Sequence, residues 1–503
     1  MLGKHNRGIS IDKILIGMQI LFIIIPVVIF FWGWTKWYIA ISASFVLLFL
    51  GIRLYQGVKI DYDYSIKKNI GFWTLSMLVI FLWVLFSGIG NFSYQTGDYI
   101  VRNPMFRDLY LYDWPIYYDL SLQPDFVKSV LGNSEGMATY VYYFAWWLPI
   151  ALISKITGCS ESLSNIFLLI WAVLCLFLVF YCLVQYLKKF SYWVLATYIL
   201  FASMDAVMWI IRYMKFPTDH LEWWANYFQY SANTTQIYWV FNQSIPIWMI
   251  VSMLLLQNKS KSKCGLSALA FAYSPFATIG MIPIAIGSIF NGEDNEQSLS
   301  KKIVNALTFE NIAIPILILV VFGSFYMQSS NSLGEYGFIF CLHPEFRTFT
   351  LYAIFIFSEV LIYFIAMGNT ARKFKFYWIT LFELLTIPLF KAGLWNDFCM
   401  RVSIPALFLL MILILQTYFE NQEHLRRRVI QVLLIIGFIT SLSEINRNLS
   451  GTLNLSEEEY INELVYSFGD MQTDNEDQVW INMNQYMPRD FQNSFFYRYI
   501  AKN

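Results

Sequence analysis

The chain alternates between long apolar runs and short polar segments. Most apolar runs approach the length of about 20 residues that a helix needs to cross the hydrocarbon core of a bilayer. They lack the two-residue alternation that transmembrane β-strands show. The pattern therefore predicts an all-α, polytopic bundle of about 11–13 membrane helices. The predicted full spans lie near residues 14–32, 36–52, 70–88, 164–187, 191–211, 238–257, 306–325, 349–368, 376–390, 402–418 and 429–445.

Composition supports a lipid environment. Of the 503 residues, 57% are hydrophobic and only 14% are charged, whereas soluble domains carry about 25% charged residues. The formal net charge is zero, so electrostatics gives no reason to expect a nucleic-acid partner. The six cysteines form no C-x-x-C pair, and we expect neither a disulfide framework nor a cysteine metal site.

Basic residues indicate which loops face the cytoplasm. Lysine and arginine favour cytoplasmic loops, and here they alternate with non-basic loops. This pattern predicts a multi-pass cell-membrane protein with a cytoplasmic N-terminus and an extracytoplasmic C-terminus. The first apolar run is too long for the core of a signal peptide and is expected to act as a signal anchor. The basic loops are Arg53–Lys68, Lys188–Lys189, Lys259–Lys263, Lys301–Lys302, Arg372–Lys375 and Arg426–Arg428.

Two apolar segments do not fit this alternation. Residues 139–156 are rich in aromatic side chains, and we expect them at the outer interface. Residues 265–290 contain two prolines and lie between basic loops, which favours a hairpin or re-entrant pair entering from the cytoplasm. We therefore predict a transmembrane domain over residues 1–445 with a large outer loop at 89–138. An extracytoplasmic tail over residues 446–503 follows.

The large outer loop concentrates chemistry between residues 97 and 120. Carboxylates beside arginines can hold a phosphate-bearing ligand while one carboxylate acts as a base. The alternative is a solvated amphipathic helix with local ion pairs, because the apolar positions recur at helical spacing. The charged residues of this segment are Asp98, Arg102, Arg107, Asp108, Asp113 and Asp119.

The loop and its sequel resemble the first outer loop of GT-C glycosyltransferases. These polytopic enzymes use polyprenyl-phosphate sugars and include protein O-mannosyltransferases and bacterial aminoarabinose transferases. Asp98 stands at their early acidic position, where the family often has an Asp-Glu pair. A short predicted helix follows at Phe106–Leu109, and Asp113-Trp114-Pro115 forms the expected turn. The aromatic-proline segment of the family corresponds to Tyr142–Pro149.

The resemblance implies a function and a set of roles. The protein would transfer a sugar from a polyprenyl-phosphate donor to a glycan or lipid acceptor on the extracytoplasmic face, with inversion. Asp98 would be the catalytic base, with Asp108 in reserve. Charge on the leaving phosphate would be stabilised by arginines. No cofactor beyond the donor is expected, and divalent metal use and oligomeric state stay open. The candidate arginines are Arg102, Arg107, Arg212 and Arg401.

The remaining candidates each have a structural alternative. Arg212 can pair with Asp205, seven residues away on the same helical face. Asn242 and Gln243 are candidate substrate-binding residues in a span, but they can also form helix–helix hydrogen bonds. Arg401 can form a local i,i+4 pair with an upstream aspartate. If these residues form one site, we expect them to meet Asp98 around one outward cavity.

Two other classes of function remain open. Glu359 and Glu383 lie in the middle of predicted spans, where a charged carboxylate costs about 2.5–3.5 kcal/mol. Such residues are typical of transporters and flippases. A polymerase of lipid-linked saccharides, or a scaffold subunit, is the third possibility.

Overall fold

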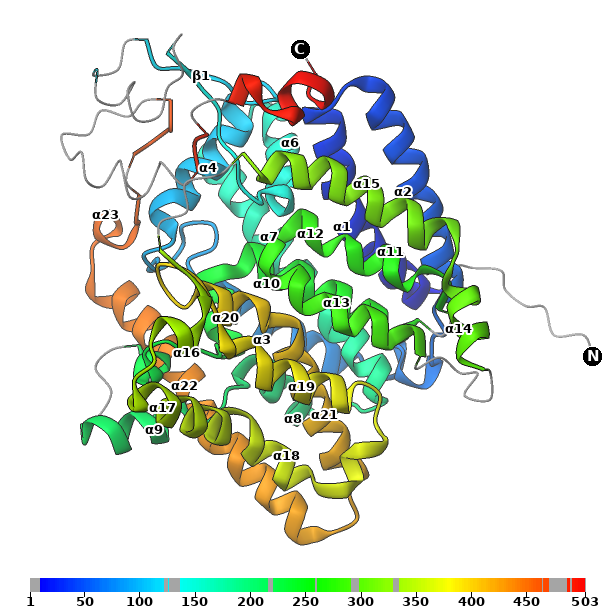
Figure 1. The fold of residues 1–503 in the computed structure, drawn as a ribbon, viewed down its shortest axis with the longest axis vertical. Helices are drawn as coiled ribbons and strands as arrows, with labels where there is room; N and C mark the ends of the chain where they lie inside the picture. Colours follow the sequence, from blue (N-terminus) through cyan, green and yellow to red (C-terminus); the bar gives the residue numbers. More distant parts are fainter. Residues whose placement is uncertain are drawn as a thin grey trace, which may run out of the picture.

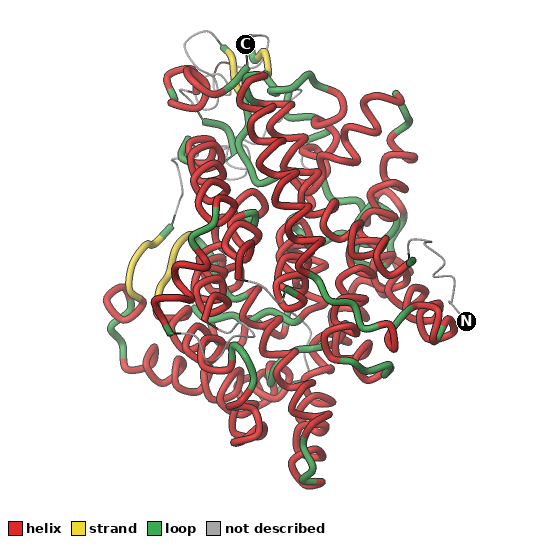
Figure 2. The backbone as a smooth tube through the Cα atoms, turned by 90° about the vertical axis from the view of Figure 1, so that its right-hand side faces the viewer, coloured by secondary structure: helices red, strands yellow, loops and turns green. Residues whose placement is uncertain are grey.

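The structure is a computed structural model that confirms the all-α prediction. It describes residues 10–121, 125, 136–215, 220–257, 260–290, 298–328, 334–463, 465–469, 486–488 and 491–502. The fold is 75% helical. Two short antiparallel strand pairs lie at the edge of the helical bundle (Figure 2). They join β1 (Tyr118–Asp119) to β2 (Met137–Ala138) and β3 (Glu335–Phe338) to β4 (Phe390–Gly393).

The described residues contain seven helices that are long and apolar enough to cross a membrane. A bent pair, α8 (Tyr192–Leu200) and α9 (Asp205–Tyr213), makes an eighth if it forms one span. The chain is therefore a multi-pass membrane protein. The seven are α1 (Ile11–Trp34), α2 (Trp37–Gly57), α7 (Glu161–Leu187), α10 (Asn233–Leu256), α15 (Phe309–Tyr326), the composite helix Phe346–Lys373 and α22 (His424–Asn454).

Shorter apolar helices accompany the long ones. How many of them cross stays a prediction, and so does the total of about 11–13 membrane helices. They are α3 (Ile70–Leu85), α6 (Leu148–Thr157, preceded by a 3-10 turn), α13 (Pro275–Phe290), α19 (Tyr377–Thr386, continued by a 3-10 turn) and α21 (Ile404–Glu420).

The helices differ in how deeply they are buried. In the most apolar window of α10, 89% of residues are buried, against 28% in α2. Helix α10 packs against α1, α7, α21 and α22, and so forms the centre of the bundle (Figure 1). Exposed Phe45 and Leu48 on α2 are two of many large apolar side chains at the periphery. Exposing these apolar side chains to water would cost free energy, whereas lipid solvates them.

Contacts define two opposite ends of the bundle. At one end, the amide of Lys502 donates to the carbonyl of Trp34 over 3.1 Å, which joins the C-terminal turn to the α1–α2 connection (Figure 1). At the other end of α1, Asp12 accepts hydrogen bonds from Ser65 and Tyr181. The basic loop at Arg53–Lys68 therefore lies opposite the C-terminal turn. This separation agrees with the charge-based orientation, which stays a prediction.

The 139–156 segment begins and ends against the same loop. The Thr139 hydroxyl donates to the carbonyl of Ile116 over 2.7 Å. Near the end of α6, the Lys155 ammonium donates to the carbonyl of Tyr112 over 2.7 Å and pairs with Asp113 at 3.1 Å. The segment thus returns to its starting side, as the interfacial interpretation requires.

The 263–290 segment also doubles back. It comprises α11 (Lys263–Ala268), α12 (Ala270–Tyr273) and α13. The Lys263 ammonium donates to the carbonyl of Ser288 over 3.1 Å, so the two ends of the segment meet. Between α12 and α13, the Ser274 hydroxyl donates to the Gln243 side chain of α10 over 2.8 Å. The segment is thus a hairpin whose tip contacts the central helix, and its re-entry into the membrane stays a prediction.

Candidate functional site

Asp98 is the N-cap residue of α4 (Tyr99–Leu111), a helix of the outer loop. Its Oδ2 forms an ion pair of 2.6 Å with Nη2 of Arg102. The Arg102 side chain is 3% exposed and that of Asp98 is 35% exposed. Burial by itself would lower the pKa of Arg102, but the Asp98 carboxylate raises it, and the net direction is upward. The Asp98 carboxylate therefore lies at the surface of the structure, and the buried Arg102 guanidinium holds it in place.

A break in α10 fixes this arrangement. Val240 has non-helical backbone angles of φ −137° and ψ 36°, which frees carbonyl groups on its N-terminal side. The Thr96 hydroxyl donates to the carbonyl of Tyr238 over 3.2 Å, and Arg102 donates to the carbonyl of Trp239. Buried carbonyl groups need such donors. The carbonyl groups freed by the break in α10 therefore receive hydrogen bonds from the Asp98 loop, and these bonds hold the loop against α10.

Arg401 approaches the same place from a distant part of the chain. It lies on α20 (Asp397–Val402), where Nη2 pairs with Asp397 at 2.9 Å. Its Nη1 donates to the Tyr143 hydroxyl over 2.7 Å, and its buried Nε has no hydrogen-bond partner in the described part of the chain. Burial would lower the pKa of Arg401, but Asp397, the two tyrosines Tyr143 and Tyr142, and then Asp98 raise it above its ordinary value.

We call Asp98, Arg102, Tyr142, Tyr143 and Arg401 the outer cluster. The rings of Tyr142 and Tyr143 lie with centroids 3.8 Å apart. Residue 486 of the C-terminal tail is also a tyrosine, and its ring packs edge-on against Tyr142 at 5.3 Å. The cluster thus joins two cations, one carboxylate and two aromatic rings from three separate segments, and Tyr486 packs against it from a fourth.

Arg107 does not belong to this cluster. Its guanidinium pairs with Glu161 of α7 at 2.5 Å and with Glu463 of the tail at 3.0 Å. It also donates to the carbonyl of Tyr466 over 2.6 Å and lies 3.9 Å above the ring of that residue. Two carboxylates already neutralise Arg107, so its role here is to bind the tail to α4 and α7.

Asp108 is buried beneath the tail. Its Oδ2 accepts hydrogen bonds from the Tyr118 hydroxyl at 2.7 Å and from the amide of Phe468 at 2.9 Å. Burial raises the pKa of Asp108 to about 6, although hydrogen bonds oppose the shift. The side chain is 0% exposed. An acceptor hydroxyl therefore has no access to it in this conformation, and Asp98 is the better placed carboxylate.

The buried Asp108 predicts a pH-dependent stability. Its pKa is higher in the folded state than the unfolded value near 3.9, so the folded protein binds more protons between the two values. This group should therefore lower the free energy of unfolding by about 2 kcal/mol as the pH rises from 4 to 7. Asp108→Asn should remove that decline, measured by thermal unfolding in detergent. An unchanged pH profile in the variant would contradict the assignment.

The remaining candidate residues lie away from Asp98 or are buried deeper in the helical bundle. Arg212 donates to the carbonyl of Trp224 and to Oδ1 of Asn226, and the predicted pair with Asp205 is not formed. Asn242 is fully buried, and both atoms of its amide group lack partners among the described residues. Gln243 accepts the hydrogen bond from the tip of the hairpin. The structure thus brings Arg401 and Arg102 to Asp98 but leaves Arg212 and Arg107 elsewhere.

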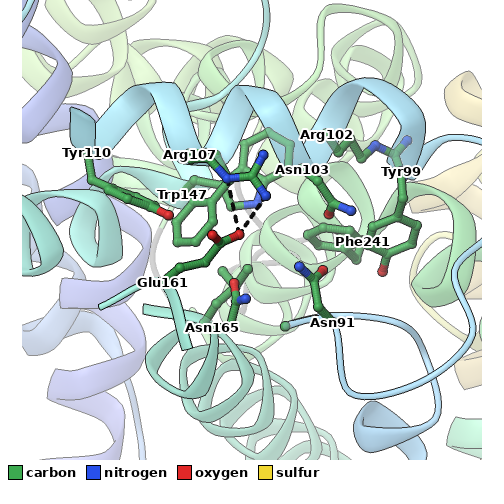
Figure 3. Close-up of a pocket in the computed structure, with 13 residues that line it drawn as sticks. Asn91, Tyr99, Arg102, Asn103, Arg107, Tyr110, Trp147, Glu161, Asn165 and Phe241 are labelled. Atoms are coloured by element: carbon green, nitrogen blue, oxygen red, sulfur yellow. Dashed lines mark hydrogen bonds and ion pairs between the residues drawn. The ribbon is translucent and has the colours of Figure 1, made fainter. Parts of the chain in front are cut away.

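A small polar cavity lies beneath α4, beside the ion pair of Arg107 and Glu161 (Figure 3). Asn91, Asn103 and Asn165 also line it, and its size suits one water molecule. It is too small for a sugar. Arg102 and Arg107 line this cavity but Asp98, Arg212 and Arg401 do not, so it is not the outward cavity expected for all the candidate residues.

The comparisons assign no family. No family model, no curated protein and no solved structure matches the chain. All six cysteines are free. The described residues contain no group of three or more histidine, cysteine, aspartate or glutamate side chains that could hold a metal ion. Function therefore has to be argued from the outer cluster itself.

Sequence reasoning missed several parts of this cluster. Tyr143 was not singled out, although it lies in the aromatic segment that carried the resemblance. The carbonyl of Trp239 becomes available only through the break at Val240, which no local motif indicates. Tyr486 belongs to a tail with no apolar pattern, and only tertiary packing places it against Tyr142.

Proposed function

We propose that this protein is an envelope glycosyltransferase of the GT-C type. It transfers a sugar from a polyprenyl-phosphate donor to a glycan or lipid acceptor on the extracytoplasmic face. The observation that carries the proposal is the approach of Arg401, from a distant part of the sequence, to the i,i+4 pair of Asp98 and Arg102. The outer cluster thus offers a base and an anion-binding group within one site.

Asp98 suits the role of base. Arg102 binds its Oδ2, which leaves Oδ1 for an acceptor hydroxyl. A direct displacement at the sugar forms the bond from the acceptor oxygen to the anomeric carbon and breaks the bond to the phosphate. The hydroxyl proton passes to Asp98, and the bonding electrons leave with the polyprenyl phosphate. A partly exposed carboxylate on a short buried helix can reach an acceptor that arrives from the aqueous side.

Arg401 is suited to stabilise the negative charge that develops on the leaving phosphate. Its guanidinium is held by Asp397 and Tyr143, so its position is fixed before a ligand arrives. Its Nε still lacks a partner among the residues that the structure describes. Guanidinium groups recognise phosphate through charge-assisted hydrogen bonds. A pre-positioned cation of this kind stabilises a leaving phosphate without reorganisation during the reaction.

An apolar groove supports a lipid-linked donor. It lies between α3, α8, α10 and α22 and is lined by Trp83, Phe86, Leu195, Tyr238 and Ile445, among others. Tyr238 also receives the hydrogen bond from Thr96, two residues before Asp98. An isoprenoid chain in this groove would therefore run beside the loop that carries the base.

Transfer by the isolated protein tests the proposal. Purified protein in detergent would be incubated with radiolabelled polyprenyl-phosphate sugars and an envelope extract as acceptor. We expect label to move into the extract without any ion gradient, which also excludes transport as the sole activity. Gradient-dependent movement of label across proteoliposomes, without covalent transfer, would favour a flippase and contradict the proposal.

Arg401→Gln should weaken donor binding. Loss of one charge-assisted interaction is worth about 1.5–3 kcal/mol, which corresponds to a decrease of about 10–100-fold in the affinity for polyprenyl monophosphate. Binding would be measured by displacement of a fluorescent polyprenyl phosphate. Arg347→Gln removes an exposed arginine near the start of the span that begins at Phe346 and should leave affinity unchanged. Equal effects of the two substitutions would rule out a specific role for Arg401.

A further inference from the structure

The helix pair of α8 and α9 is broken at residues 201–204, with a bend of 45°. Neighbouring helices satisfy the freed carbonyl groups. The amide of Asn233 donates to the carbonyl of Phe201 over 2.9 Å, and the Tyr363 hydroxyl donates to that of Ala202 over 2.9 Å. Irregular backbone inside a membrane protein persists only with such partners. Hydrogen bonds from Asn233 and Tyr363 thus hold the broken backbone in place.

A second irregular turn faces this break. Residues Phe357–Leu361 form a π-helical turn, a feature that occurs often at functional sites. The Ser203 hydroxyl, from the break, donates to the backbone carbonyl of Glu359 over 2.9 Å. The Glu359 side chain is 0% exposed, and among the described residues neither of its carboxyl oxygens has a partner at full hydrogen-bond geometry, although Ser203 and Trp224 act on it as weak donors. An unpaired carboxylate in this position would be very costly.

Two further carboxyl groups face Glu359. Asp205 and Glu222 are the groups whose charges act on it most strongly. Glu222 accepts hydrogen bonds from the Gln229 side chain at 3.0 Å and the amide of Ala232 at 2.8 Å, which suits an anion. Among the described residues, Asp205 accepts one side-chain hydrogen bond, from the indole of Trp224 at 3.2 Å, its Oδ2 accepts none, and the charge of His220 acts on it. Glu359 and Asp205 therefore lack the donors that two neighbouring anions would need.

The surrounding ionisable groups extend toward the surface. His220 lies 3.9 Å from Glu222 and 2.6 Å from Glu444, which pairs with the partly exposed Arg447 at 2.5 Å. Burial would lower the pKa of His220, but Glu444 and then Glu222 raise it above its ordinary value. No cation pairs with Glu359 or Asp205 among the described residues. The ionisable side chains around Glu359 are Asp205, Glu222, Tyr230, Tyr363 and Cys399.

We propose that Glu359 and Asp205 form a proton-binding site at the break between α8 and α9. One proton, taken from water, binds to a carboxylate oxygen of the pair and is released to water again. With the proton bound, the pair carries one charge at most. Without it, two anions repel each other across the contact between the break and the π-helical turn. The proton thus controls the packing of α9 against this turn, independently of sugar transfer at the outer cluster.

Infrared difference spectroscopy tests this site directly. The purified protein in lipid nanodiscs would be titrated while the C=O stretching band of protonated carboxylic acids is followed. In an Asp108→Asn background, which removes the titrating carboxyl group beneath the tail, we expect a band that disappears as the pH rises and that is absent when Glu359→Gln and Asp205→Asn are combined. Asp205→Asn should keep the band but move its titration to lower pH, because the neighbouring anion is gone.

Glu383→Gln is the matched control. Glu383 is also buried with both carboxyl oxygens unpartnered, but no second carboxyl group acts on it. Its removal should leave the titrating band in place. Persistence of this band in the Asp108→Asn background when Glu359→Gln and Asp205→Asn are combined would overturn the proposal. The Asp108→Asn variant alone also decides, because a carboxylic band that never responds to pH, or no band at all, excludes an exchangeable proton.

Discussion

Asp98→Asn is expected to lower the rate of sugar transfer by about 10²–10⁴-fold, the usual contribution of a general base. The amide has nearly the same shape as the carboxylate but takes no proton from the acceptor. Its oxygen can still accept the hydrogen bond from Arg102, so α4 should keep its place. Binding of polyprenyl phosphate should change little, because Arg401 remains. The measurement is the initial rate of label transfer at saturating donor.

Asp113→Asn is the control for this prediction. Asp113 lies in the same outer loop, and its side chain is fully exposed apart from its pair with Lys155. Exposed pairs contribute at most about 1 kcal/mol, and transfer should therefore stay near the wild-type rate. A thermal melt of each variant separates lost chemistry from lost folding. Full activity of Asp98→Asn would exclude this residue as the base.

Gly280→Ala is expected to disrupt the bundle beneath the outer cluster. A Cβ atom at this position would lie 2.1 Å from the carbonyl oxygen of Val402 and 3.0 Å from a ring carbon of Pro405. Backbone must move to make room, because a carbonyl group cannot turn aside like the end of a flexible side chain. Overpacking of this kind costs about 1–3 kcal/mol. Movement of α20 would also displace Arg401, so donor affinity should fall together with the melting temperature.

Gly71→Ala makes the same chemical change in open space. A Cβ atom at Gly71, in the first turn of α3, meets nothing within 4 Å. Alanine favours a helix over glycine by about 1 kcal/mol, so this variant should be as stable as the wild type or slightly more stable. If Gly280→Ala melted like Gly71→Ala, the close approach of α13 to α20 would be wrong.

The two ion pairs of the outer cluster show how local and tertiary information combine. Asp98 with Arg102, and Asp397 with Arg401, are both i,i+4 pairs and follow from helical spacing alone. The sequence could not show that α4 is largely buried or that the two pairs lie close enough for their charges to act on each other. That outcome depends on the break in α10, whose free carbonyl groups bind the Asp98 loop.

The assignment of the other arginines illustrates the opposite case. Arg107 and Arg212 have the same chemistry as Arg401, and composition gives no means of ranking the three. In the structure, carboxylates from α7 and the tail neutralise Arg107, while backbone and side-chain oxygens near residues 224–226 hold Arg212. The partners of both arginines lie beyond the i,i+3 and i,i+4 positions, so helical spacing in the sequence cannot identify them.

The sequence by itself determined that the protein is a helical membrane bundle, because each long apolar run must satisfy its backbone internally in lipid. It also indicated the irregular segments at 139–156 and 265–290, where aromatic residues or prolines interrupt a simple span. Only the tertiary structure decided which charges meet. Burial makes an unpaired charge expensive, so helices that break inside the bundle are held by whatever polar groups the fold brings to them. The outer cluster and the pair of Glu359 with Asp205 are both products of that constraint.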